Sequence, residues 1–389
     1  MEPEAPTSEP RAASTVDRVG AAAALIALSG AVLLPVYVLR ANRIVSGTDQ
    51  PLAVGGPAAW TLVLFAVGAF AVALLMRGRL RERAELACAV GILASLAWAL
   101  AHAASSLAPD PASPARVSIG LGAWLAMAGA AALWFAATRT PTDRTARTGA
   151  AALVAASWLA AGAWGGLSRL SILREYTLQA NTFWNEVGTH LALVGISLGL
   201  AVIIGVPLGI LSSRVRWVRT VSLSAAGLIQ TVPSLALLGL LVLPLAALGL
   251  PGIGPLPGII ALTLYALLPV VRNTYLGLTQ VDASAIDAGL GMGMTRLQLL
   301  RDVEAPLALP LVVEGVRIAT VMTIGIAAVV AFIGVGTLGV LIIQGLGYQA
   351  DDLILLGAVP IVLLAVVADA GLRAIGRLIT SPGIRVEAR

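Results

Sequence analysis

Three pairs of ionisable side chains lie directly beside apolar stretches of this sequence. Glu314 and Arg317 are three residues apart, and Asp369 and Arg373 are four residues apart. Both spacings place two side chains on one face of a helix, where opposite charges attract each other. We therefore expect structural ion pairs. The alternative is that Glu314 or Asp369 relays a proton or another ion, a frequent role of carboxylates inside a membrane.

A third pair, Glu186 and His190, is also spaced by four residues and lies near Phe183 and Trp184. Aromatic side chains gather where a membrane meets water. We expect this pair to anchor a helix at the outer interface. Two alternatives stay open, namely contact with a protein outside the membrane and, for His190, a part in ion coupling.

The residue types that are missing exclude several kinds of chemistry. All 25 basic residues are arginine, so the chain has no lysine for a phosphate-binding loop or a Schiff base. One cysteine allows no disulfide within the chain, and two histidines are too few for a conventional zinc or haem site. We expect His102 and Cys88 to pack between helices. The chain is thus predicted to be no enzyme and to bind no cofactor, and any ATP that drives it is bound by another subunit.

Membrane helices must position these side chains. Of the 389 residues, 58% are hydrophobic and 12% are charged, whereas about 25% are charged in a soluble domain. The mean hydropathy is +0.93. A helix crosses a bilayer with about 20 apolar residues. Ten apolar runs are visible: Ala21–Leu39, Ala58–Met76, Leu86–Ala108, Val117–Ala137, Gly149–Leu167, Leu191–Leu211, Leu223–Leu248, Ile259–Val271, Ile318–Gly334 and Leu353–Ala368. The predicted fold class is an all-α polytopic membrane protein with about ten transmembrane helices.

Arginines indicate the orientation, because cytoplasmic loops collect basic residues near the membrane. They follow the second, fourth, sixth and tenth runs, for example at Arg77, Arg139, Arg214 and Arg373. Both termini are therefore predicted to be cytoplasmic, with a disordered tail at residues 1–20 and a second tail at residues 377–389. The first run has full length and is expected to stay rather than to be cleaved with a signal peptide.

A change in composition divides the membrane part. Residues 21–167 hold five runs rich in alanine and tryptophan, residues 168–186 form a linker, and residues 187–376 hold five runs that polar residues and prolines interrupt. Polar side chains at membrane depth usually face protein or a water path. The residues expected to line such a path are Gln230, Thr231, Pro233, Ser234, Asn273 and Tyr275. The alternative is hydrogen bonding between helices.

The longest connection between runs, residues 281–310, has the pattern of a helix-turn-helix. A short helix is predicted over Ser284–Met292, and Gly291 and Gly293 permit a tight turn. Thr295 and Gln298 match a capping box, which predicts a second helix over Arg296–Ala305. Pro306 and Pro310 are expected to end that helix and to start the next span. Such a unit is suited to docking in a groove of another protein, and the alternative is a plain structured connection.

This segment resembles the cytoplasmic coupling loop of binding-protein-dependent ABC importer permeases. The loop pattern is Glu-Ala-Ala, three residues, Gly, nine residues and Ile-x-Leu-Pro. Here Asp287-Ala288-Gly289 stands for Glu-Ala-Ala, Gly293 matches the glycine, and Val303-Glu304-Ala305-Pro306 stands for the last element. The resemblance implies that the loop sits in a cleft of an ATP-hydrolysing subunit, which binds ATP and Mg²⁺, and that residues 187–376 form a five-helix type I permease core. The coupling residues so implied are Asp287, Ala288, Gly289, Gly291, Gly293, Thr295, Gln298, Val303 and Pro306.

Four further strings narrow the resemblance to permeases that import osmoprotectants such as glycine betaine, choline and carnitine. They are residues 190–214, 230–238 (QTVPSLALL), 265–278 (YALLPVVRNTYLGL) and 291–298. The layout, with extra spans before the core, resembles Yeh-type permeases. The resemblance implies a multi-pass protein of the cytoplasmic (inner) membrane that works with ATPase subunits, a second permease subunit (identical or homologous) and an extracytoplasmic solute-binding protein, in a lipid bilayer and without nucleic acid. The alternative function is an ion-coupled secondary transporter of a small zwitterionic solute.

Overall fold

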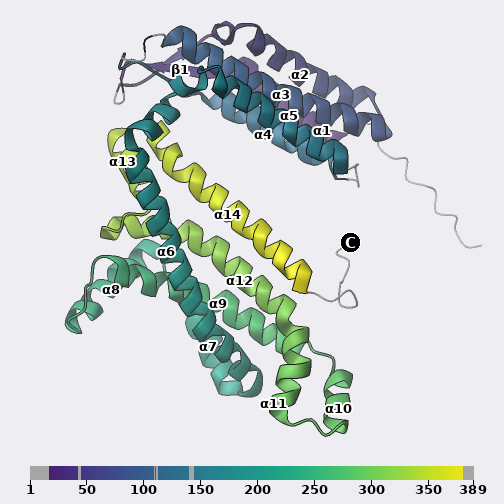
Figure 1. Cartoon of the computed structure of the whole chain (residues 1–389), viewed down its shortest axis with the longest axis vertical. Helices are drawn as coiled ribbons and strands as arrows, with labels where there is room; N and C mark the ends of the chain where they lie inside the picture. Colours follow the sequence, from purple (N-terminus) through teal and green to yellow (C-terminus); the bar gives the residue numbers. More distant parts are fainter. Residues whose placement is uncertain (1–16, 43–44, 109, 111–112, 140–143, 380–389) are drawn as a thin grey trace, which may run out of the picture. The chain divides into compact units, whose positions relative to one another are not determined.

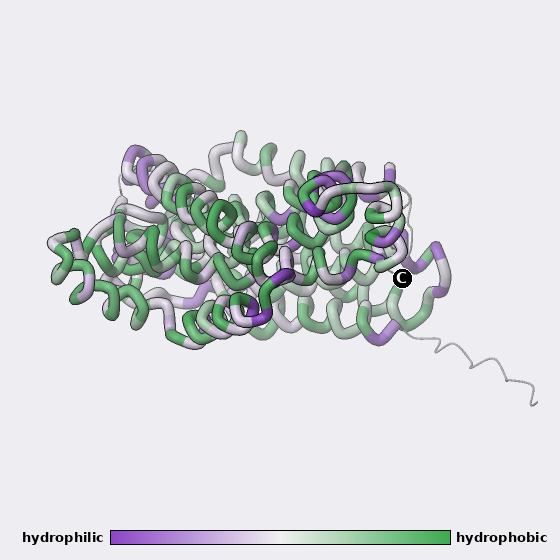
Figure 2. The backbone as a smooth tube through the Cα atoms, turned by 90° about the horizontal axis from the view of Figure 1, so that it is seen from below, coloured by the Kyte–Doolittle hydropathy of each residue, from purple (hydrophilic) through white to green (hydrophobic). Residues whose placement is uncertain are grey.

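A computed structural model describes residues 17–42, 45–108, 110, 113–139 and 144–379 of the chain. These residues belong to two compact units, residues 1–178 and residues 179–389, and each is built almost entirely from helices (Figure 1). Hydrophobic residues dominate the helices, and hydrophilic residues gather in short stretches (Figure 2).

Five helices make up most of the first unit. They are α1 (Arg18–Leu33), α2 (Gly56–Leu75, preceded by the 3-10 turn η1, Leu52–Gly55), α3 (Gly78–Leu107), α4 (Leu121–Ala137) and α5 (Arg144–Ala163). Helix α1 packs against α4 and α2, and α3 packs against α2, α4 and α5. Alanine fills much of the core, and a Cβ atom added to Gly122 would lie 2.4 Å from the carbonyl oxygen of Gly30. Small residues therefore let the α1 and α4 backbones approach closely.

A three-stranded antiparallel sheet, with strand order β2-β1-β3, completes the first unit. Its strands are β1 (Tyr37–Arg40), β2 (Thr48–Gln50) and β3 (Arg116–Ile119). The first and fourth runs were predicted to be helical throughout, and this is wrong at the end of the first and at the start of the fourth. Helix α1 stops shortly before Pro35, because a residue that precedes proline avoids the helical conformation. The apolar residues that follow pair as strands.

The second unit begins within the 44-residue helix α6 (Ser171–Arg214), which has a non-helical residue, Gln179, at the boundary between the units. After it come α7 (Arg216–Thr231), α8 (Ser234–Ala247), α9 (Pro255–Thr279), α10 (Ala283–Gly291), α11 (Arg296–Leu299), the π-helical turn η3 (Leu300–Glu304), α12 (Ala305–Ala327), the 3-10 turn η4 (Ala328–Ile333), α13 (Gly339–Tyr348) and α14 (Asp351–Ile379). Helix α12 packs against α9 and α14. Glycine again permits the close approach, since a Cβ atom on Gly315 of α12 would lie 2.7 Å from Asn273 Cβ of α9.

The number of spans differs from the prediction. Among the described residues, six helices are long and apolar enough to cross a membrane, or seven if the bent pair α7 and α8 is one span. Helices α1, α4 and α13 are apolar but shorter, and polar residues of its first turns, Arg144 and Arg147, lower the hydropathy of α5. An all-α polytopic membrane protein is confirmed, but length and composition of the described helices do not reproduce ten crossings.

The boundaries of the predicted tails and linker also differ. Helix α1 begins at Arg18, where the carboxylate of Asp17 accepts a hydrogen bond from the Val19 amide at 3.0 Å. The predicted first tail thus overlaps a helix, and residues 1–16 lie outside the described part. Much of the predicted linker is helical, because α6 starts at Ser171. Helix α14 continues to Ile379, and residues 380–389 are again outside the described part.

Candidate functional site

The connection after α9 folds as the predicted helix-turn-helix, and its two short helices project at one end of the second unit (Figure 1). Asp282 caps α10, since its carboxylate accepts a hydrogen bond from the Ser284 amide at 2.9 Å, which lowers the pKa of Asp282. The turn falls on Gly293, whose φ of 81° favours glycine. Thr295 and Gln298 form the predicted capping box, in which Gln298 Oε1 accepts from the Thr295 amide at 2.8 Å.

The second helix of this connection does not end at Pro306, contrary to the prediction. Helix α11 continues through the π-turn η3 into α12 without a break. In η3 the Ala305 amide donates to the Leu300 carbonyl, five residues earlier. A proline ring clashes with the carbonyl four residues before it in a regular helix. The wider π-turn directly before Pro306 explains how the helix accommodates this residue.

A close contact inside the loop accounts for one departure from the coupling-loop pattern. Gly289 is buried, and a Cβ atom there would lie 2.7 Å from Leu299 Cδ1 and 3.3 Å from Met294 Sδ. Leu299 itself is fully buried. Glycine, in place of the usual alanine, thus makes room for the leucine of the second short helix.

The outer surface of the loop combines apolar tips with charged residues. Met292 is 72% exposed, Leu297 is 74% exposed, and Leu290 is also exposed. Asp287, Ala288, Gly291 and Pro306 are exposed as well, whereas Val303 is half-buried. Large apolar side chains held outward by a rigid turn are typical of a surface that binds another protein.

An ion pair that the sequence did not reveal ties this loop to α6. Arg214, the last residue of α6, binds the carboxylate of Glu304, the last residue of η3. The Glu304 side chain is only 2% exposed and that of Arg214 is 44% exposed. The partners are 90 positions apart. No helical spacing could have found them, although Glu304 lies within the coupling-loop pattern.

The residues expected to line a path surround a sharp bend. Helices α7 and α8 meet at an angle of 110°. Gln230 precedes the bend and donates its amide to the Tyr265 carbonyl of α9 at 3.0 Å, which is a hydrogen bond between helices. Thr231 and Pro233 are exposed at the bend, and Ser234 is half-buried at the start of α8.

The two remaining path candidates lie further along α9. Asn273 is half-buried and donates its amide to the Pro269 carbonyl at 2.8 Å, one turn earlier in the same helix. The Tyr275 hydroxyl accepts a hydrogen bond from Arg219 of α7 at 3.1 Å, and the guanidinium lies 5.7 Å from the centre of the ring. Both side chains thus have partners in the protein, and neither is fully buried.

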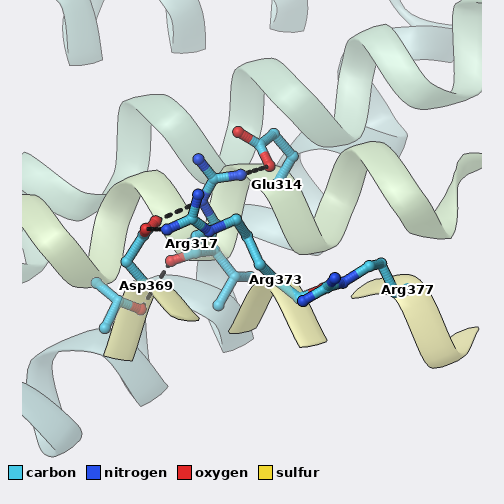
Figure 3. A network of polar contacts seen from close by, with 7 residues as sticks. Glu314, Arg317, Asp369, Arg373 and Arg377 are labelled. Atoms are coloured by element: carbon cyan, nitrogen blue, oxygen red, sulfur yellow. Dashed lines mark hydrogen bonds and ion pairs between the residues drawn. The ribbon is translucent and has the colours of Figure 1, made fainter. Parts of the chain in front are cut away.

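The two predicted charge pairs form and join into one network between α12 and α14 (Figure 3). Arg317 binds Glu314 at 2.6 Å and Asp369 at 2.7 Å, and Asp369 also binds Arg373. The link between Arg317 and Asp369 was not predicted. Every carboxylate of the network thus has an arginine partner, as expected of structural ion pairs.

The third predicted pair, Glu186 and His190, lies in α6. Both are buried in α6, and the His190 ring lies 3.1 Å from the Ile324 carbonyl of α12 through Nε2. The neighbouring Trp184 is exposed and packs edge to face on Phe183. His190 thus connects α6 to α12, and a role of the pair as an anchor at the outer interface stays a prediction.

Models of two protein families match most of the chain. The family "Binding-protein-dependent transport system inner membrane component" matches residues 201–381. The family "ABC transporter permease YehY, N-terminal domain" matches residues 17–173. The second match covers most of the first unit, and the first covers most of the second unit.

Individual relatives match about half of the chain. The osmoprotectant import permease protein OsmW of Salmonella typhimurium is 47% identical over 196 residues, which are 50% of this chain and 91% of OsmW. The carnitine transport permease protein OpuCB of Listeria monocytogenes is 40% identical, over 54% of this chain and 96% of the relative. Among solved structures, an inward-facing MetNI methionine ABC transporter is 25% identical over 52% of this chain and 98% of that chain, with a TM-score of 0.48.

The two families and the relatives are permeases of ABC transporters, and none of these matches supports the alternative of an ion-coupled secondary transporter. Permeases of this type do not hydrolyse ATP, which is the work of separate subunits. The chain belongs to the binding-protein-dependent ABC importer permeases and is a multi-pass inner-membrane subunit of such a transporter.

Proposed function

We propose that this chain forms part of the path by which an ABC importer carries a quaternary ammonium osmoprotectant of the glycine betaine or choline type into the cell. The names of its relatives support this substrate class, since they are described as permeases for osmoprotectants, for carnitine, or for glycine betaine, carnitine and choline. Quaternary ammonium groups are usually held by aromatic cages. Residues 187–376 contain only five aromatic side chains, at Trp217, Tyr265, Tyr275, Phe332 and Tyr348. This sparseness favours a separate extracytoplasmic binding protein as the source of selectivity.

The exposed coupling loop is the observation that carries the proposal. Met292 and Leu297 point outward from a turn whose geometry depends on Gly293 and on the Thr295–Gln298 capping box. An ATPase subunit that holds these tips in a groove would move the loop when it binds ATP and Mg²⁺. Asp287, Ala288, Gly289, Gly291, Val303 and Pro306 would support the same contact.

Movement of the loop has two routes into the membrane part. The Arg214–Glu304 ion pair joins the loop to the end of α6, and the loop follows α9 directly in the chain. ATP binding would close the ATPase dimer, draw the loops of two permease subunits inward and open the path between them to the outside. Gln230, Thr231, Pro233, Ser234, Asn273 and Tyr275 are the residues that we place along this path.

In the proposed organisation, extra membrane helices over residues 21–167 and a largely helical linker over 168–186 precede a permease core over residues 187–376. This core pairs with a second permease subunit, identical or homologous. Both chain ends would be cytoplasmic. The arginines that follow the second, fourth, sixth and tenth apolar runs support this orientation.

Co-purification tests the proposal. The tagged chain is isolated from its native membrane, and the proteins that accompany it are identified. An ATPase subunit, a second permease subunit and a binding protein are expected, and the purified binding protein should then bind glycine betaine or choline in a titration. A binding protein that binds neither of these solutes would overturn the substrate class, and isolation without an ATPase would overturn the role of the loop.

A further inference from the structure

Pro269 leaves one carbonyl of α9 without its helical partner. In a regular helix the amide of residue 269 would donate to the carbonyl of Tyr265, four residues earlier, but proline has no N–H group. A carbonyl without a donor is costly at membrane depth. Gln230 of α7 supplies the missing hydrogen bond, because its Nε2 donates to the Tyr265 carbonyl at 3.0 Å. The same amide lies 3.9 Å from Met322 Sδ of α12.

A second carbonyl lacks a helical donor at the bend between α7 and α8. Val232 caps the C-terminus of α7, and its carbonyl has no amide of a continuing helix to accept from, since Pro233 follows and α8 starts at Ser234. The Tyr265 hydroxyl donates to this carbonyl. Tyr265 is only 4% exposed. A side chain of α7 thus donates to a carbonyl of α9, and a side chain of α9 donates to the carbonyl at the end of α7.

Helix α9 leads directly into the coupling loop, since it ends at Thr279 and α10 begins at Ala283. A movement of the loop must therefore displace α9, and the two hydrogen bonds join α9 to the 110° bend at which Thr231 and Pro233 are exposed. We infer that Gln230 and Tyr265 form a latch that carries movement of the coupling loop to the bend in the solute path. This inference rests on the proposed function. The two members of the latch are positioning residues.

The first test measures coupling in the complete transporter, with its ATPase subunits and binding protein, in proteoliposomes. Gln230→Leu and Tyr265→Phe each remove one hydrogen bond and leave a carbonyl without a donor. The ratio of solute taken up to ATP hydrolysed is expected to fall about tenfold. The control is Gln344→Leu, the same change at an exposed amide of α13, which should leave the ratio unchanged. An unchanged ratio in Gln230→Leu would overturn the latch.

A second variant distinguishes a latch from general damage. Pro269→Ala restores an amide that can donate to the Tyr265 carbonyl within α9. Gln230→Leu should therefore lower the ratio of solute taken up to ATP hydrolysed much less in the Pro269→Ala background than in the natural chain. An equal loss in both backgrounds would contradict the assignment of Gln230 to this carbonyl.

A third measurement needs no knowledge of the solute. Cys88 is the only cysteine of the chain, so Cys88→Ala with Thr231→Cys places a single thiol at the bend. Its labelling rate by a maleimide is expected to differ between the nucleotide-free and ATP-bound transporter, and Gln230→Leu should abolish this difference. The latch would be refuted if the labelling rate still differed between the two states in Gln230→Leu. It would also be refuted if the rate did not differ between them when Gln230 is present. Failure of glycine betaine and choline uptake in the unaltered transporter would instead refute the substrate proposal.

Discussion

At the scale of single residues, the Arg214–Glu304 ion pair is the contact most sensitive to change. Glu304 is nearly inaccessible to solvent, whereas Arg214 is partly exposed. A buried charge without its partner is costly, while an exposed arginine can be solvated by water. The two partners are therefore not equivalent, and their substitution should have unequal effects.

We predict that Arg214→Met destabilises the transporter by about 1–3 kcal/mol, because it leaves the Glu304 carboxylate buried and unpaired. Glu304→Gln should have a smaller effect, and the double variant should recover part of the loss. The melting temperature of the purified transporter and its ATPase activity with the loaded binding protein measure both effects. Arg216→Met, at an exposed arginine two positions away, is the control. Equal effects of Arg214→Met and Arg216→Met would contradict the role of the pair.

At the scale of elements, the turn between α10 and α11 depends on one backbone conformation. Gly293 has a φ of 81°, which costs a residue with a Cβ atom about 1–2 kcal/mol. Gly291 is the last residue of α10, and no described atom outside its own stretch of helix is within 4 Å of the position that its Cβ would take. The same substitution should thus affect the two glycines differently.

Gly293→Ala is expected to weaken co-purification of the ATPase subunit, because the turn must distort to relieve the strain. Gly291→Ala should have a smaller effect, since alanine favours a helix over glycine by about 1 kcal/mol. Quantification of the ATPase that is recovered with each variant, at equal amounts of membrane-inserted permease, measures the difference. The same loss for both variants would argue against a docking role of this particular turn.

The charge network joins two other elements, α12 and α14. Arg317 is its centre, because it binds Glu314 of its own helix and Asp369 of α14 (Figure 3). The side chain of Arg317 is 28% exposed, so solvent reduces the energy of its contacts. The network should stabilise the packing of α12 against α14 and should not couple transport to an ion gradient.

We predict that Arg317→Met lowers the unfolding free energy by about 1 kcal/mol and the melting temperature by a few degrees. Uptake energised by ATP alone, without an ion gradient, should persist in this variant and in Asp369→Asn. Thermal unfolding and uptake into proteoliposomes measure these two effects. Complete loss of uptake in Asp369→Asn with normal stability would instead indicate that the carboxylate acts in transport.

At the scale of the whole molecule, the coupling loop, the bend and the charge network all lie in residues 179–389. The match to OsmW covers 91% of that relative, and the match to OpuCB covers 96% of that relative. Each match covers only about half of this chain. The first unit carries a family match of its own.

A chain that consists of residues 179–389 is accordingly expected to insert into the membrane and to recover its ATPase subunit on purification. The reason is that the loop surface and the Arg214–Glu304 pair are retained. The amount of ATPase per permease, compared with that of the full chain, measures the outcome. Recovery of a membrane-inserted fragment without ATPase would assign the first unit a direct part in assembly.

The sequence by itself determined the features that depend on composition or on neighbouring positions. Low charge and high apolarity require a membrane environment, whatever the packing. The Thr295–Gln298 capping box and the pairs Glu314–Arg317 and Asp369–Arg373 follow from helical spacing, and the structure contains all three. Such contacts involve residues three or four positions apart, which the geometry of a helix brings together.

Only the tertiary structure decided the contacts between distant segments. The Arg214–Glu304 pair and the bond from Gln230 to the Tyr265 carbonyl join different helices. The apolar residues of β1 could be assigned to a strand only once β2 and β3 were seen to pair with it. The physical reason is that hydropathy describes the preference of a residue for a membrane or a core, whereas hydrogen-bond partners are chosen when the packed helices and strands bring unsatisfied groups together.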